Sequence, residues 1–139
     1  MRPKTLLHKL TAWLLTLAML TTFITGFTLG VSAAENFYIV AGSPELFGEA
    51  WNPAAEENML SLAADGNYYK TYNNVAAGTY LFKVTTNGAW DNGEYNLEGD
   101  ATFGGADAQV TVERDGSVVI IGFDGTKALV EVKAPDDYP

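Results

Sequence analysis

The sequence predicts an all-β domain folded as an antiparallel sandwich and preceded by an N-terminal leader. Three observations predict it: several short apolar runs of strand length, turn dipeptides between those runs, and almost no segment with helical periodicity. The chain has 139 residues and no cysteine, so the domain must be held by its core without disulfides.

The first 34 residues have the composition of a secretory signal peptide. Their parts are, in order, the basic residues Arg2, Lys4 and Lys9, an apolar run over 10–29, and small residues over 31–34. We expect cleavage after Ala33 or Ala34 and export from the cell. The alternative is an uncleaved membrane anchor, since the apolar run is long enough to cross a bilayer.

The remaining chain, about 105 residues, is the size of one domain. We expect the sandwich over residues 35–133 and a tail or linker over 134–139. Without the leader, five basic residues face 17 acidic ones, a net charge of −12. Such a chain repels phosphate backbones and anionic lipids, so we expect no nucleic acid and no membrane partner. The single histidine, His8, lies in the leader, which excludes a His–Cys zinc site and a His-based triad.

The expected strands follow one another along the chain as apolar or alternating runs bounded by turn residues. They cover residues 37–41, 68–72, 79–86, 108–113, 117–123 and 128–133. Turns are expected at Asn73-Asn74, at Asp124-Gly125 and at Asp115-Gly116, the last as a hairpin joining the strands on either side. Residues 56–63 are compatible with a short helix or a strand.

Residues 88–105 are poor in β-branched side chains and rich in Gly, Asn, Asp and Glu. We expect a long ordered loop here, with a short strand near residues 101–103. Long loops in compact domains are often functional.

The most informative segment is 77–91, a strand that ends in a tight turn and an indole. Tyr80, Phe82 and Val84 share one face of this strand, and Lys83 lies on the other. Asn87-Gly88 is a strong turn dipeptide because both residues tolerate positive φ. Trp90 follows at once.

Polar side chains surround Trp90 in the sequence, namely Asp91, Asn92, Glu94 and Asn96. A flat ring beside carboxylates and amides is a common way to bind sugars, since the ring covers the C–H face and the polar groups bond the hydroxyls. The same oxygens suit calcium, but their spacing does not match a twelve-residue calcium loop, so we expect no metal and no cofactor. Asp91 and Glu94 are a poor glycosidase pair, because a small sandwich rarely builds the deep cleft that such enzymes need.

Two further aromatic residues are candidate sugar contacts. Trp51 lies in a polar loop, in the run Trp51-Asn52-Pro53, and Tyr95 follows Trp90 by five residues. The alternative for both tryptophans is burial in the core, which is common for this residue. Lys83 and Asn87 flank the same region and could reach a bound sugar.

The chain resembles the small starch-binding module of bacterial pullulanases and amylases, which is related to domains of outer-membrane starch-binding lipoproteins. The resembling segments are Val40-Ala41-Gly42-Ser43, Leu46-Phe47-Gly48, Trp51-Asn52-Pro53, Ala77-Gly78-Thr79-Tyr80, Phe82-Lys83-Val84 and Asn87-Gly88-Ala89-Trp90-Asp91. The last of these is the most specific, since it is similar to the family's Asn-Gly-Ser-Trp-Asp.

The resemblance implies an immunoglobulin-like sandwich that binds α-glucans and catalyses nothing. By position it implies Trp51 and Trp90 as stacking residues, with Lys83, Asn87, Asp91 and Tyr95 as polar or stacking partners. The leading hypothesis is therefore a secreted bacterial module that binds starch, amylopectin, glycogen or pullulan, with other extracellular modules as further candidate partners. The alternative is an immunoglobulin-like scaffold or adhesion module that uses a sheet edge or an apolar patch instead.

Overall fold

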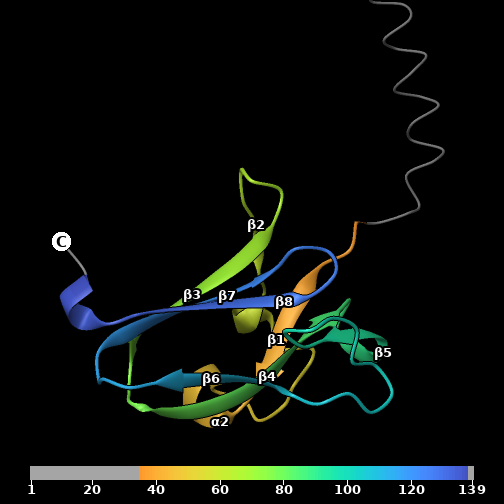
Figure 1. Ribbon diagram of the computed structural model, residues 1–139. Helices are drawn as coiled ribbons and strands as arrows, with labels where there is room; N and C mark the ends of the chain where they lie inside the picture. The colour runs from red at the N-terminus through yellow and green to blue at the C-terminus, as the bar shows by residue number, and fades with distance from the viewer. Residues whose placement is uncertain (1–34, 138–139) are drawn as a thin grey trace, which may run out of the picture. The chain divides into compact units, whose positions relative to one another are not determined.

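The computed structural model describes residues 35–137, and the predicted leader lies outside them. Two four-stranded antiparallel sheets face each other, with β3, β7 and β8 above β4 and β6 in Figure 1. One sheet contains β1 (Tyr38–Gly42), β4 (Gly78–Thr86), β5 (Ala89–Tyr95) and β6 (Ala108–Val112). The other contains β2 (Ser61–Leu62), β3 (Tyr68–Val75), β7 (Ser117–Phe123) and β8 (Ala128–Lys133). The predicted all-β, immunoglobulin-like antiparallel β-sandwich is confirmed.

Strand β4 is the centre of its sheet. It pairs with β1 along one edge and with β5 and then β6 along the other, so that Phe82 is opposite both Gly42 and Ala108. The predicted apolar face is buried. The opposite face is covered as well, because Lys83 is 7% and Thr85 0% exposed. This outer covering of β4 is where the candidate site lies.

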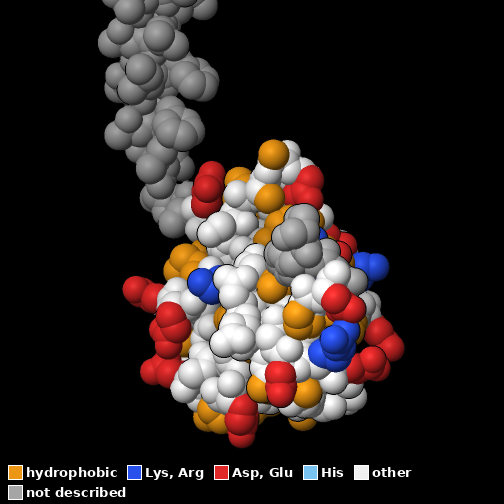
Figure 2. Space-filling model, turned by 90° about the vertical axis from the view of Figure 1, so that its left-hand side faces the viewer, with side chains coloured by type: hydrophobic (Ala, Val, Ile, Leu, Met, Phe, Trp, Pro, Cys, Tyr) orange, Lys and Arg blue, Asp and Glu red, His pale blue; other side chains and the backbone are white. Residues whose placement is uncertain are grey.

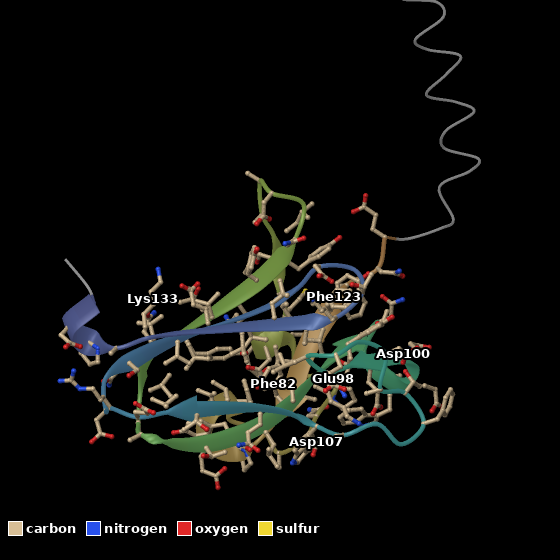
Figure 3. The ribbon with its side chains drawn as sticks, in the orientation of Figure 1. Phe82, Glu98, Asp100, Asp107, Phe123 and Lys133 are labelled. Atoms are coloured by element: carbon tan, nitrogen blue, oxygen red, sulfur yellow. The ribbon has the colours of Figure 1, made fainter. Side chains whose placement is uncertain are left out.

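The core fills the space between the two sheets. Figure 3 shows Phe82 and Phe123 entering it from opposite sheets. The ring of Phe123 contacts Tyr38 and Tyr95, with centroids 4.5 and 4.6 Å apart, so the core also fastens β1 and β5. Burying each large apolar side chain contributes about 1.5–3 kcal/mol.

The connection after β6 differs from the prediction. Asp115-Gly116 does not close a hairpin, because β6 pairs with β4 while β7 pairs with β3 and β8. The turn carries the chain from one sheet to the other. Two hydrogen bonds hold it against the link between β3 and β4. The Ala77 N–H donates to Asp115 Oδ1 at 2.8 Å, and the Gly116 N–H donates to the Val75 carbonyl at 3.0 Å. The turn predicted at Asp124-Gly125 is present, and it joins β7 to β8 as a hairpin.

The turn expected at Asn73-Asn74 is instead part of β3. The register of β3 against β7 shifts between Tyr72 and Val75, and Asn74 takes up the irregularity with φ +54°. Asparagine tolerates that conformation, so the pair bends the strand without ending it.

Residues 88–105, expected as one long loop, begin with a strand. After Asn87 and Gly88, with φ +54° and +79°, the chain returns along β4 as β5. The turn and the free edge of β4 outweigh the weak β propensity of these residues. No strand forms at 101–103; Asp100 makes a single bridge to Tyr95. The true loop is residues 96–107, hereafter the 96–107 loop.

The helices are short. They are α2 (Pro44–Phe47), the 3₁₀ turn η1 (Glu56–Asn58) and the 3₁₀ turn η2 (Pro135–Asp137). Residues 56–63, for which the sequence allowed either a short helix or a strand, contain both: η1 is followed by β2. Within residues 35–137, no helix is long and apolar enough to cross a membrane.

Candidate functional site

A hollow of about 440 Å³ opens on the outer side of β4. It is lined by Trp51, Lys83, Trp90, Glu94 and Asp107, and we call it the indole hollow. These residues come from four separate segments, namely the stretch between α2 and η1, β4, β5 and the end of the 96–107 loop. The fold therefore assembles the hollow, and no short stretch of sequence contains it.

The backbone of Trp51 is held against β1. Its N–H donates to the Gly42 carbonyl at 2.9 Å, and Ala50 bridges the same glycine. Trp51 has φ +51°, a left-handed conformation that is an outlier for a bulky residue. The following Asn52 closes the turn by accepting a hydrogen bond from the Ala54 N–H.

Trp90 lies in a bulge of β5. Thr86 is opposite Ala89, but the next residue back, Thr85, is opposite Glu94, so residues 90–93 have no partner in the ladder with β4. A bulge bends its strand and redirects side chains, and bulges are frequent beside binding sites. Here it directs an indole into the hollow.

The two indoles are neighbours. Their ring centroids are 6.4 Å apart and their planes are inclined by 35°. Both tryptophans are half-buried, which fits neither the core alternative nor full projection into solvent. Two inclined rings at this spacing form a curved apolar surface.

Charged side chains form the floor of the hollow. Lys83 Nζ is 2.5 Å from Glu94 Oε1 and 3.8 Å from Asp107 Oδ1. The side chains of Lys83 and Glu94 are 9% and 13% exposed, whereas that of Asp107 is 39% exposed. The lysine and the glutamate are thus fixed to each other, while the aspartate has oxygen atoms available to a ligand.

Two of the candidate residues have structural contacts elsewhere. The Asn87 amide oxygen accepts a hydrogen bond from the Phe37 N–H, and its nitrogen donates to Asn36, both at 2.9 Å. The Tyr95 ring packs against Phe123 at the edge of the core. Neither residue lines the indole hollow.

Asp91 is exposed in the bulge next to Trp90 and does not line the hollow either. The structure therefore brings together Trp51, Trp90 and Lys83 from the predicted set. Glu94, which we considered among the polar neighbours of Trp90, is part of the floor.

Asp107 was missed. It directly precedes β6, and the pairing of Ala108 with Phe82 places it next to Lys83. Pairing this strand with the central strand would have revealed it, but the Asp115-Gly116 turn suggested a hairpin with the next strand instead.

Acidic groups in this region do not form a metal cage. Among residues 35–137, no group of three or more His, Cys, Asp or Glu side chains is placed to hold a metal ion. The side chain of Asn96 was considered as a calcium ligand. Its amide oxygen accepts hydrogen bonds from the N–H groups of Glu98 and Gly99, and its amide nitrogen donates to the Ala106 carbonyl. It therefore holds the 96–107 loop together.

Comparison with known proteins gives two findings. Residues 40–129 match the profile of the pullulanase X25 domain. Among solved structures, the chain is similar to the pullulanase from Bacillus acidopullulyticus, with a TM-score of 0.53 and 18% sequence identity over 70% of this chain. The similar region is only 12% of that enzyme's length. No curated protein matches the sequence.

Proposed function

The chain belongs to the pullulanase X25 domain family, and from this premise we propose that it is a secreted, non-catalytic module that binds α-glucan chains. Starch, amylopectin, glycogen and pullulan share the required chemistry, namely linked neutral glucose rings. The observation that carries the proposal is the pair of inclined indoles in one hollow with a polar floor.

The aromatic part of the proposal rests on Trp51 and Trp90. A glucose ring has C–H bonds on its faces and hydroxyls at its rim, so stacking on an indole removes apolar surface from water without burying a hydroxyl. Successive glucose units of an α-linked chain are inclined to each other. The 35° angle between the indoles suits two such units better than two parallel rings would.

The polar part rests on Asp107 and Glu94. Carboxylate oxygens accept hydrogen bonds from sugar hydroxyls, and charge-assisted bonds of this kind are the stronger ones. Asp107 has the more accessible carboxylate of the two, so we assign it the first role in bonding a hydroxyl. The ion pair with Lys83 holds Glu94 in place before a ligand arrives. Asp91, Asn87 and Tyr95 remain candidates of lower rank, because they do not line the hollow.

The lack of catalysis is part of the proposal. A glycosidase needs a proton-donating carboxyl and a second carboxylate on opposite sides of the scissile bond. In the indole hollow, Glu94 and Asp107 both face the ammonium group of Lys83. Each of the two carboxylates is thus an ion-pair partner of the same lysine.

Charge supports a neutral ligand. On the face shown in Figure 2, acidic side chains are spread around the edge, and the basic side chains lie apart from one another. Together with the net charge of −12 after the leader, this disfavours nucleic acid and anionic lipid as partners. Export follows from the leader expected over residues 1–34.

Native gel electrophoresis in amylopectin tests the proposal. We expect the polysaccharide to retard the wild-type protein and to retard Trp90→Ala and Trp51→Ala much less. Leu62→Ala is the matched control, since it removes a 63% exposed apolar side chain from β2 and should leave retardation unchanged. Equal mobility of wild type with and without polysaccharide would support the scaffold alternative, and release of reducing sugar would show an enzyme.

A further inference from the structure

The most exposed large apolar side chain described is Phe103, at 90% of its surface. We propose that this ring is a third sugar-stacking position beside the indole hollow, so that the site takes an extended α-glucan segment instead of a short chain end. This inference rests on the proposed function and adds a residue and a length preference to it.

Phe103 is placed close to the hollow by its neighbours. The Glu94 N–H donates to Thr102 Oγ1 at 2.9 Å, and the Ala101 N–H donates to the Glu94 carbonyl at 2.8 Å. One residue later comes Phe103, and four residues after that comes Asp107 on the floor of the hollow. The segment carrying Phe103 is thus bonded to one lining residue, Glu94, near its start and ends at another, Asp107.

The loop around Phe103 is fastened on both sides. The Thr102 N–H donates to Asp100 Oδ1 at 2.9 Å, and the Gly105 N–H donates to the Ala101 carbonyl at 3.1 Å. A Cβ on Gly105 would meet the Ala101 Cβ at 2.5 Å, so this turn is closed against a residue that is 2% exposed. Figure 3 shows Asp100 at the side of the sandwich where β5 lies. A ring held outward by a tied loop loses little conformational freedom on binding.

The backbone conformation of Phe103 is a second, independent observation in favour of a sugar-stacking role. Among the described residues, four that are not glycine have φ in the left-handed region: Trp51, Asn74, Asn87 and Phe103. The two asparagines adopt it readily, but it is an outlier for a bulky aromatic residue. One of the two aromatic outliers, Trp51, lines the indole hollow, and the other, Phe103 with φ +69°, lies on the loop that borders it. Strained backbone conformations of this kind cluster at active and ligand-binding sites, where the surrounding structure holds them in place.

The expected consequence is a dependence on ligand length. A short oligosaccharide covers the two indoles and gains nothing from Phe103, whereas a longer one reaches the ring. Stacking on one aromatic ring is worth roughly three- to tenfold in affinity.

Titration with maltotriose and maltoheptaose, followed by tryptophan fluorescence, tests the inference. We expect Phe103→Ala to weaken maltoheptaose binding roughly three- to tenfold and to leave maltotriose binding within about twofold. Phe103→Trp should restore the longer ligand, and Phe103→Gly, which removes the ring while relieving the backbone, should behave like Phe103→Ala. Leu97→Ala is the control in the same loop, since this side chain is 37% exposed and should matter for neither ligand.

The outcomes separate the inference from the proposed function. If Phe103→Ala binds both ligands as the wild type does, or loses both equally, the third position is overturned while glucan binding stands. If Trp90→Ala abolishes binding of both ligands and Phe103→Ala affects only the longer one, the inference is supported. A wild-type protein that binds neither ligand overturns both.

Discussion

The side chain of Trp51 lines the indole hollow, while its backbone has φ +51°, a left-handed conformation that is unfavourable for tryptophan. Because the N–H of Trp51 is bonded to Gly42, the chain cannot relax to a common conformation without losing that bond. The left-handed conformation costs a residue with a Cβ about 1–2 kcal/mol relative to glycine. The contribution of the ring and the cost of the backbone can therefore be measured separately at one position.

We expect Trp51→Gly and Trp51→Ala to lose amylopectin retardation equally, since both lack the ring. Their stabilities should differ. Glycine adopts φ +51° without strain, so the glycine variant should be more stable than the alanine variant by about 1 kcal/mol in urea unfolding. Equal stabilities would show that the conformation at this position is not costly.

At the scale of elements, the β7–β8 hairpin depends on one carboxylate. Asp124 Oδ1 accepts hydrogen bonds from the N–H groups of Thr126 and Lys127, at 2.8 and 2.9 Å, and these bonds hold the pKa of Asp124 below its usual value. A group whose pKa is lower in the folded state contributes stability above its unfolded pKa, near 3.9, and that contribution is lost as pH falls through the folded pKa.

We therefore expect the free energy of unfolding to fall as pH is lowered from about 6 to about 3, and to fall less in Asp124→Asn. Urea unfolding at both pH values gives the measurement. Asp65, Asp100 and Asp136 also have lowered pKa values, through hydrogen bonds from Tyr69, Thr102 and Arg114 respectively, so the variant should retain part of the dependence. An identical pH dependence in wild type and variant would contradict the role of Asp124.

The strands also show which parts of the fold could be predicted from the sequence and which could not. Strand β4 could be predicted, because alternation and the Asn87-Gly88 turn are local signals. Strand β5 could not, since its glycine, asparagine and acidic residues form a strand only because the turn returns them to a free edge of β4. Strand β6 was placed correctly along the chain but with the wrong partner, because the choice of partner is a non-local property.

The same limit applies to the candidate site. The sequence identified both tryptophans and Lys83, but it does not contain the distance between them. The 6.4 Å separation of the indoles depends on the bond from Trp51 to Gly42 and on the bulge in β5. Asp107 was missed because β6 was expected to pair with β7, whereas its pairing with β4 is what places Asp107 beside Lys83.

At the scale of the whole molecule, charge makes a prediction about binding. Residues 35–139 carry a net charge of −12, while the proposed ligand is neutral. Salt screens interactions between charges and leaves stacking and short hydrogen bonds nearly unchanged. We expect the dissociation constant for maltoheptaose to change by less than about twofold between about 0.05 and 0.5 M sodium chloride. A steep change would indicate a charged ligand.

The two ends of the described chain leave the sandwich at opposite ends of β4. Asn36 is bonded to Asn87 just after β4, whereas Asp136 pairs with Arg114 beside the end of β6, where Val112 is opposite Gly78 at the start of β4. Tension applied at these two ends would thus run along the strands. The bonds between β1 and β4 would be loaded in shear, all together, and would not open one after another. A pull applied at these two ends would therefore be resisted by the whole β1–β4 ladder at once.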